Sequence, residues 1–142
     1  MSNRQSVARE AIDELPGLAG RIIGPEDAEF ESARAVYNAM IDRHPALIAR
    51  CAGARDVADL IGFARKHDLL LAVRGGGHNG AGLGTCDGGV VIDLSPLKGV
   101  EVDARKRTVR VAGGSTWGEV DAATGEHGLA TPSGIISTTG AG

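Results

Sequence analysis

Residues 46–74 carry the most regular hydrophobic pattern of the chain, and this pattern predicts a βαβ unit. A short apolar run at 46–51 predicts a buried strand, and residues 70–74 predict a second strand. Between them, residues 54–67 repeat apolar side chains on one stripe, as a helix that packs on a sheet does. The members of this stripe are Val57, Leu60, Ile61 and Ala64. Strand, helix and strand in this order predict a parallel pair.

The pattern before this unit is weaker. The first twenty residues are polar and mixed, so residues 1–24 are expected to form a loose lead and residues 25–142 the domain itself. From Pro25 a helix is predicted to about Ile41, because proline and acidic residues suit a first helical turn. Its apolar face would consist of Phe30, Ala33, Val36 and Tyr37.

The last third of the chain predicts antiparallel strands. Residues 90–94 form an apolar strand, and 99–103 and 108–112 alternate around a polar turn, which is typical of a hairpin. The fold class is therefore α+β. A small parallel βαβ unit is followed by an antiparallel β-rich unit.

A helix is predicted to close this second unit. Thr116 can cap it, and Glu119, three residues later, completes a capping box. The helix is expected to run to about His127, and Gly128 would end it.

The strongest chemical signal is the run from Arg74 to Gly80, which follows the predicted strand at 70–74 directly. Three successive glycines (Gly75, Gly76, Gly77) let the backbone approach a ligand closely. Successive N–H groups in such a turn form an anion site that suits a pyrophosphate. His78 and Asn79 come next. The run favours a nucleotide cofactor with a histidine beside it; a glycine-rich turn without ligand is the structural alternative.

A dinucleotide site of the Rossmann type is disfavoured. Gly75, Gly77 and Gly80 match its glycine spacing, but that motif needs a helix to open at the glycines. Five glycines between residues 80 and 89 argue against a helix there.

Four sequence runs carry a family resemblance, in this order: AVRGGGHNGAG, GGVVIDLSPLKGVEVD, RTVRVAGGSTWGEVD and HGLATPSGIISTTGAG. Residues 21–142 thereby resemble the FAD-binding (PCMH-type) domain of the vanillyl-alcohol oxidase/p-cresol methylhydroxylase superfamily. Berberine-bridge-enzyme-like oxidases look closest. The resemblance implies FAD as cofactor, bound covalently through the ring of His78. Neutral imidazole is a nucleophile near neutral pH, which suits this role.

The resemblance also implies further cofactor contacts around His78 and in the later runs. The expected set is Arg74, Gly75, Gly76, Gly77, His78, Asn79, Gly80, Ser95, Gly114, Pro132, Gly134, Thr138, Thr139, Gly140 and Gly142. Several of these have open alternatives. For Ser95, a turn after a strand explains the sequence equally well. Arg74 can pair with phosphate or form a salt bridge at a strand end, Asn79 can donate to the cofactor or stabilise a turn, and Gly114 can belong to a bulge.

Flavin attachment is expected to be single. Some relatives carry a cysteine two residues after the glycine that matches Gly134, and it forms a second bond to flavin. This chain has Ile136 at that position.

Composition narrows the remaining classes. Fifteen basic and eighteen acidic residues give a net charge of −3, which offers no basic footprint for nucleic acid or for an anionic membrane. The apolar runs are too short to span a bilayer. Cys51 and Cys86 have no C-x-x-C spacing, and the histidines have no metal-ligand spacing. A reducing, cytoplasmic location and the absence of a metal site are expected.

In function, the chain is expected to be the N-terminal fragment of an FAD-linked oxidase, with no catalytic residue of its own. In the intact enzyme, hydride would pass from an alcohol or amine-type carbon of a small-molecule substrate to FAD, with O2 as acceptor. The alternative is a non-catalytic FAD- or nucleotide-binding module or an inactive gene fragment. The substrate domain would lie beyond Gly142, and the fragment alone is expected to self-associate.

Overall fold

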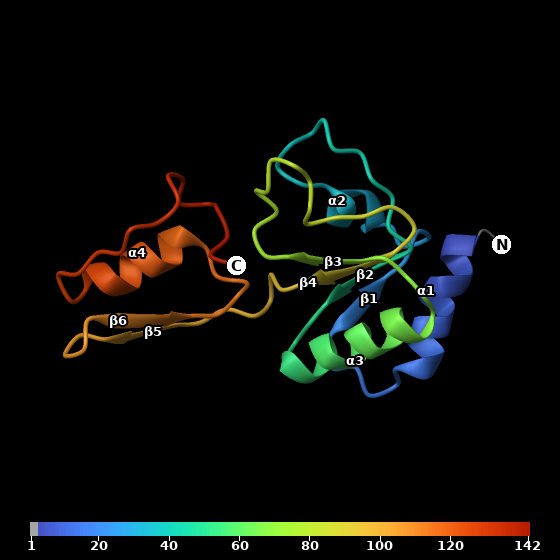
Figure 1. Ribbon diagram of the computed structural model, residues 1–142, viewed down its shortest axis with the longest axis horizontal. Coiled ribbons are helices and arrows are strands. Elements are labelled where there is room, and N and C mark those ends of the chain that lie inside the picture. Colours follow the sequence, from blue (N-terminus) through green and yellow to red (C-terminus); the bar gives the residue numbers. More distant parts are fainter. Residues whose placement is uncertain (1–2) are drawn as a thin grey trace.

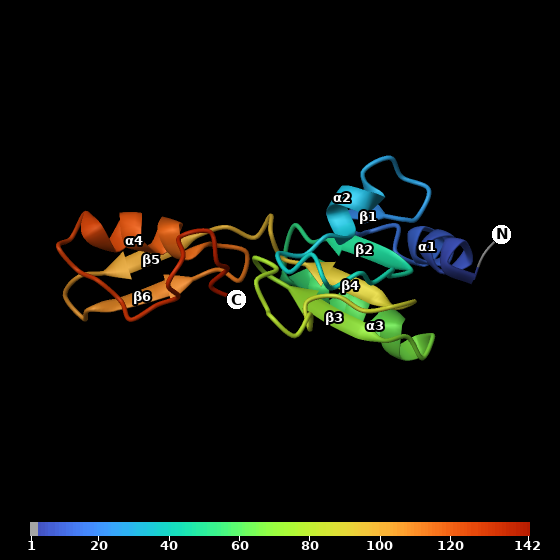
Figure 2. The same ribbon diagram turned by 90° about the horizontal axis from the view of Figure 1, so that it is seen from above.

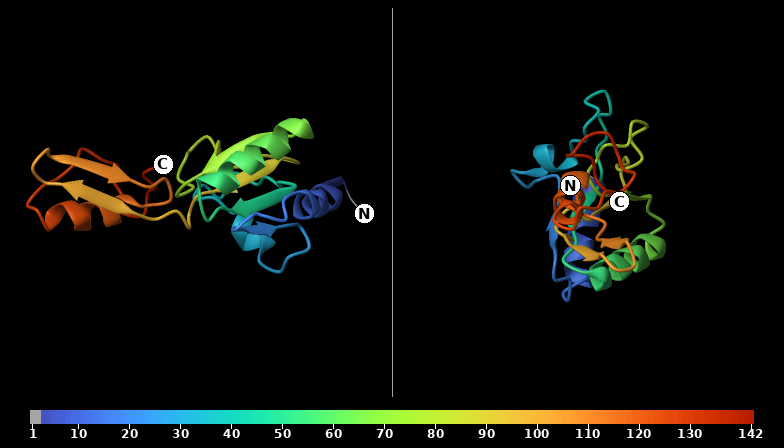
Figure 3. Two further views of the ribbon diagram at one scale, coloured as in Figure 1. Left: turned by 90° about the horizontal axis from the view of Figure 1, so that it is seen from below. Right: turned by 90° about the vertical axis from the view of Figure 1, so that its left-hand side faces the viewer.

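The computed structural model describes residues 3–142 as two units placed along the long axis of the molecule (Figure 1). The first unit is a four-stranded mixed sheet with three helices, and the second is a two-stranded hairpin with one helix. Figure 3 shows the two units end to end, with the C-terminus at their junction. The α+β class predicted from the sequence is confirmed.

The N-terminal residues are part of the first unit. Helix α1 (Asn3–Glu14) and strand β1 (Arg21–Ile23) occupy them, so the expectation of a loose lead over residues 1–24 is wrong for the described residues. Val7, Ala8 and Ala11 are buried against the sheet. Two of these three are alanines, and so short an apolar stripe gives only a weak helical pattern.

Helix α2 (Phe30–Arg34) is much shorter than the helix predicted from Pro25 to Ile41. Phe30 and Ala33 are buried as expected, but the backbone turns extended at Ala35, with ψ of 140°. Val36 and Tyr37 therefore lie outside the helix. Backbone groups that a longer helix would use internally are engaged by the glycine loop after β3, as described below. Tertiary contacts override the local helix signal.

The predicted βαβ unit is present, with strand β2 (Leu47–Arg50), helix α3 (Ala54–Lys66) and strand β3 (Leu71–Arg74). The sheet order is β1-β2-β4-β3. Strand β4 (Val90–Asp93) runs parallel to both β2 and β3 and lies between them, so these two strands are not direct neighbours. All residues of β4 are buried, while β3 alternates, and a strand buried on both faces belongs at the centre.

Helices cover both faces of this sheet (Figure 2). Helices α1 and α3 pack on one face, against Leu47 of β2 and Ile92 of β4. Helix α2 packs on the other face, against Ile48 and Val91, which are register partners. This segregation follows from the strand period, because successive side chains point to opposite faces.

The second unit matches its prediction except at residues 90–94, which were grouped with the antiparallel strands but form β4 in the parallel part of the first sheet. Strands β5 (Val100–Asp103) and β6 (Thr108–Val111) form an antiparallel hairpin, and α4 (Trp117–Gly125) packs beside it. The backbone N–H of Thr116 donates to Oε2 of Glu119 over 2.6 Å, as in a capping box. Gly128 has a left-handed φ of 65° in the turn after the helix.

Candidate functional site

Three glycine-containing stretches that are distant in the sequence meet beyond the carboxyl end of β3. A Cβ atom at Gly76 would lie 2.3 Å from the backbone nitrogen of Gly140. A Cβ atom at Gly75 would lie 2.4 Å from the carbonyl oxygen of Gly142 and 2.8 Å from that of Gly113. Side chains do not tolerate such distances, so the backbones can meet only because these positions are glycine.

The C-terminal stretch is held to the start of α4 by backbone hydrogen bonds. The donor and acceptor pairs are Trp117 to Thr139 (3.0 Å), Gly118 to Ser137 (2.8 Å) and Ala141 to Ser115 (2.8 Å). Thr116 and Gly140 also form an isolated antiparallel bridge. The second unit thereby presents residues 137–142 to the glycine loop of the first unit.

A cavity of about 390 Å3 lies at this junction. Its lining residues are Val73, Arg74, Gly75, Gly76, Gly77, His78, Asn79, Leu83, Gly84, Thr139, Gly140 and Gly142. Half of them are glycines, so backbone forms much of the wall. The volume lies within the range of about 300–1,000 Å3 that is typical of small-molecule sites.

The cavity brings together nine of the predicted cofactor residues from both glycine-rich runs. Those nine are Arg74, Gly75, Gly76, Gly77, His78, Asn79, Thr139, Gly140 and Gly142. Six others lie outside its lining: Gly80, Ser95, Gly114, Pro132, Gly134 and Thr138. The prediction missed Val73, Leu83 and Gly84. Their position beside the glycine run in the sequence could have indicated that they line the cavity.

Three of the six residues outside the lining have a structural role. A Cβ atom at Gly114 would lie 1.9 Å from the carbonyl oxygen of Leu94, and one at Gly134 would lie 2.9 Å from the ring of Trp117. The N–H of Ser95 donates to Oδ1 of Asp93 in a turn. Close packing and turn geometry account for these positions.

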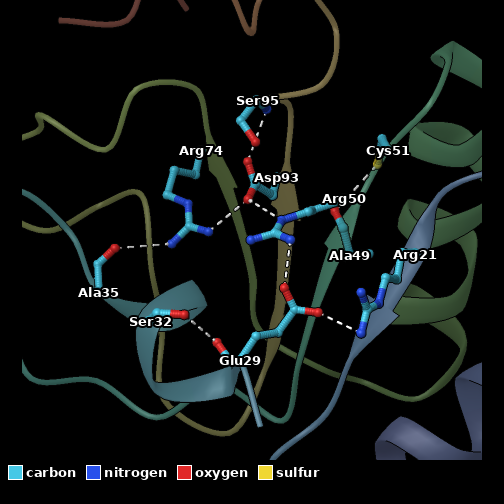
Figure 4. A network of polar contacts seen from close by, with 10 residues as sticks. All are labelled: Arg21, Glu29, Ser32, Ala35, Ala49, Arg50, Cys51, Arg74, Asp93 and Ser95. Atoms are coloured by element: carbon cyan, nitrogen blue, oxygen red, sulfur yellow. Dashed lines mark hydrogen bonds and ion pairs between the residues drawn. The ribbon is translucent and has the colours of Figure 1, made fainter. Parts of the chain in front are cut away.

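Arg74 forms the strand-end salt bridge that was one of its two predicted roles. Its Nη2 donates to Oδ2 of Asp93 over 2.8 Å, and both side chains are buried (Figure 4). The two residues are register partners at the ends of β3 and β4. The guanidinium charge is therefore compensated inside the protein.

Further ion pairs extend this contact across the sheet, as Figure 4 shows. Nε of Arg50 lies 3.9 Å from Oδ2 of Asp93, and Nη1 of Arg50 donates to Glu29 over 2.8 Å. Glu29 also pairs with Arg21 of β1. The network joins all four strands of the sheet next to the start of the glycine loop.

His78 lies at the edge of the cavity with its ring half-buried. Its Nδ1 is 2.9 Å from the carbonyl oxygen of Gly76, which can only accept, so Nδ1 carries the proton in this contact. Nε2 lies 3.5 Å from Oγ1 of Thr138, on the C-terminal stretch. Both glycine-rich runs therefore contact this imidazole.

Asn79 stabilises the loop. Its Oδ1 accepts the backbone N–H groups of Ala81 and Leu83, each over 3.1 Å. This is the turn role that the sequence left open, although Asn79 also lines the cavity.

Both cysteines are free thiols and buried. Burial raises the pKa of Cys51 to about 11 and also raises the pKa of Cys86. Burial and raised pKa values make both thiols unreactive. Ile136, the residue from which a single flavin attachment is predicted, is about half exposed, at 47%.

Neither a membrane span nor a metal cluster occurs among residues 3–142. None of their helices is long and apolar enough to cross a membrane. They contain no group of three or more His, Cys, Asp or Glu side chains placed to hold a metal ion.

Fold and site together define a class, an α+β cofactor-binding domain with a glycine-walled cavity between its two units. Residues 45–142 match the family model described as FAD binding domain. The chain belongs to this family of FAD-binding domains, within the vanillyl-alcohol oxidase/p-cresol methylhydroxylase superfamily.

Known relatives agree with this assignment. The chain is 33% identical over 123 residues to (R)-6-hydroxynicotine oxidase of Paenarthrobacter nicotinovorans, covering 87% of this chain and 27% of the relative. It is 31% identical to an FAD-linked oxidoreductase of Dictyostelium discoideum, covering 99% of this chain and 31% of the relative. The chain thus spans between a quarter and a third of the length of these relatives.

Solved structures show the same fold. The crystal structure of 6-hydroxy-D-nicotine oxidase from Arthrobacter nicotinovorans aligns with a TM-score of 0.83 at 33% identity, covering 87% of this chain and 27% of that one. The wild-type BBE-like 1 protein of Physcomitrella patens aligns with a TM-score of 0.81 at 24% identity, covering 99% and 29%.

Proposed function

We propose that this chain binds FAD in the glycine-walled cavity and forms part of the cofactor domain of a flavin-dependent oxidoreductase. One observation carries the proposal. The glycine loop after β3 and the C-terminal glycine stretch meet in backbone contact beside His78. The family match and the FAD-linked relatives support it.

The residues present fit an anionic cofactor held by backbone. Arg74 is the one lysine or arginine among the cavity's described lining residues, and Asp93 compensates its charge. A pyrophosphate would therefore rely on N–H dipoles of residues 75–77, Gly140 and Gly142. The N–H groups of Thr139 and Ala141 already donate to the carbonyl oxygens of Ile136 and Ser115. Gly77 has a φ of 71°, in the left-handed region where successive N–H groups can converge.

His78 is the proposed point of covalent attachment. Its ring nitrogen would form a bond to the 8α-methyl carbon of the flavin. His78 would lose its ring proton on attachment, and O2, as the oxidant, would take up the two protons and two electrons released overall as H2O2. The chain's own contribution is to hold the imidazole at the cavity edge through Gly76 and Thr138.

Bound FAD would supply the redox chemistry of the intact enzyme, by accepting hydride from an alcohol or amine-type carbon of a small-molecule substrate, with O2 as electron acceptor. The oxidase named among the relatives supports this class of reaction. The residues described here would bind and orient the cofactor.

A visible spectrum after acid precipitation tests the proposal in the full-length protein. We expect a yellow wild-type protein whose flavin stays in the precipitate, and a His78→Ala variant whose flavin is released into the supernatant. A colourless wild-type protein would contradict FAD binding. Acid-stable flavin on His78→Ala would place the bond at another residue. Tightly bound flavin that no alcohol or amine reduces would favour the non-catalytic module.

A further inference from the structure

The segment between α2 and β2 lies on the glycine loop. In Figure 1 it is the cyan stretch beside the yellow-green loop above the sheet. The backbone N–H of Tyr37 donates to the carbonyl oxygen of Gly77 over 3.1 Å. Nδ2 of Asn38 donates to the carbonyl oxygen of Gly80 over 3.2 Å. Backbone and side-chain contacts thus fix residues 37 and 38 against the loop, independently of the Tyr37 ring.

Packing at the far end of the segment strengthens this attachment. Ile41 lies against the loop at Gly82, where a Cβ atom would be 2.7 Å from Cγ2 of Ile41. Nη1 of Arg74 also reaches the carbonyl oxygen of Ala35 over 3.5 Å. The segment is therefore anchored at residues 35, 37, 38 and 41.

From this anchored position the phenol ring of Tyr37 stacks on the imidazole of His78. The ring centroids are 4.4 Å apart and the planes meet at 19°. Tyr37 is 68% exposed, so its ring adds little to the hydrophobic core. The ring contact that Tyr37 makes is the stack on His78.

A histidine ring needs such a contact to hold one plane. The torsion between Cβ and the ring is broad, because it joins an sp3 and an sp2 atom. Gly76 and Thr138 contact ring nitrogens, which lie in the ring plane. Tyr37 contacts the face, and a stacked partner resists rotation of the plane.

We propose that Tyr37 is a positioning residue for flavin attachment, which holds the imidazole plane of His78 for bond formation. The inference rests on the proposed covalent function of His78. The bond forms between a ring nitrogen and the flavin 8α carbon. Each partner loses one proton, and the two electrons and two protons pass to O2. Tyr37 takes no part in that exchange.

The test compares three variants of the full-length, flavin-free protein after addition of FAD. Tyr37→Ala removes the stack, Tyr37→Phe keeps it, and Met40→Ala changes an 89% exposed side chain in the same segment. Acid-stable flavin is measured against time, and reversible FAD affinity is measured before attachment. A 13C-labelled histidine spectrum, assigned with His78→Ala, reports the ring-current shift at His78.

We expect Tyr37→Ala to attach flavin about threefold to tenfold more slowly, the range that a lost aromatic pair accounts for. Its reversible FAD affinity should stay within about twofold, since the N–H of residue 37 remains on Gly77. Tyr37→Phe and Met40→Ala should match the wild type. The ring-current shift at His78 should disappear only in Tyr37→Ala.

The inference fails if Tyr37→Ala attaches flavin at the wild-type rate, or if Met40→Ala slows attachment equally. It also fails if the His78 signal is unchanged in Tyr37→Ala. Failure of the proposed function is distinct, because the wild type itself would then carry no acid-stable flavin.

Discussion

Single atoms decide how the cavity closes. Gly76 and Gly140 belong to different units. The space that a side chain would occupy at either position is filled by the backbone of the other. The sequence showed that both runs were rich in glycine, but not which glycines contact each other and which face a ligand. Gly114 illustrates the difficulty, because a Cβ atom there would lie 1.9 Å from the carbonyl oxygen of Leu94, while its expected cofactor contact stays a prediction. Glycine permits both roles, and only the fold distinguishes them.

A methyl group at Gly76 should separate the two runs. Its Cβ would be 2.3 Å from the Gly140 nitrogen and 2.7 Å from its Cα. We expect Gly76→Ala to lose roughly 1–3 kcal/mol of unfolding free energy, as overpacking does, and to retain much less flavin. Denaturant unfolding and flavin content measure both effects.

Gly62→Ala on α3 is the matched control, because a Cβ atom added there would have no other atom within 4 Å. It should keep its flavin and gain stability by up to about 1 kcal/mol. Equal losses in both variants would mean that the glycine contact is unimportant.

At the scale of elements, long-range contacts decide what local pattern leaves open. The amphipathic stripe of α3 and the apolar run of β4 were readable, since their burial is set by their own periodicity. The end of α2 could not be predicted, because the backbone of the residues that follow it bonds to the glycine loop. Nor could the placement of residues 15–20, which connect α1 to β1 and are held by Asp56. This carboxylate accepts the N–H groups of Ala19 and Ala52 over 3.0 and 2.8 Å.

Asp56 should therefore stabilise the first unit. Burial alone would raise its pKa, but hydrogen bonds from backbone N–H groups outweigh burial and lower the pKa. We expect Asp56→Ala to cost roughly 1–3 kcal/mol, because buried N–H groups lose their acceptor. Asp59→Ala, whose carboxylate makes only a loose 3.8 Å pair with Arg55 on the surface, should cost much less.

The Asp56 effect should depend on pH. Its folded-state pKa is depressed, so its stabilisation is complete above the unfolded value of about 3.9 and is lost as pH falls through the lower folded value. The difference in unfolding free energy between wild type and Asp56→Ala should shrink below about pH 4. A difference that stays constant from neutral to strongly acidic pH would contradict this.

At the scale of the whole molecule, β3 is an edge strand whose apolar side chains stay partly exposed. Leu71 is 39% and Val73 50% exposed, and Leu70 beside them is 66% exposed. The register partners of Leu71 and Val73 on β4 are Val90 and Ile92, and both are fully buried under α1 and α3. The sequence predicted apolar strand residues but not which edge would remain open. That depends on the insertion of β4 between β2 and β3.

Residues 1–142 alone are expected to self-associate through this edge and to hold little flavin. Light scattering during gel filtration should show oligomers, and Leu71→Lys should reduce them. Ile12→Lys, at an exposed apolar side chain on α1, should not. A monomeric chain that melts cooperatively and retains flavin would contradict the expectation.

The proposed function depends on where flavin is bound. Mass spectrometry of proteolytic peptides from the full-length protein tests this most directly. We predict flavin mass on the peptide that contains His78 and on no other, with the peptides of Ile136, Cys51 and Cys86 unmodified. Flavin bonded to a peptide without His78, or bridging His78 to a cysteine, would contradict the single attachment. Protein without any flavin-bearing peptide would contradict covalent binding altogether.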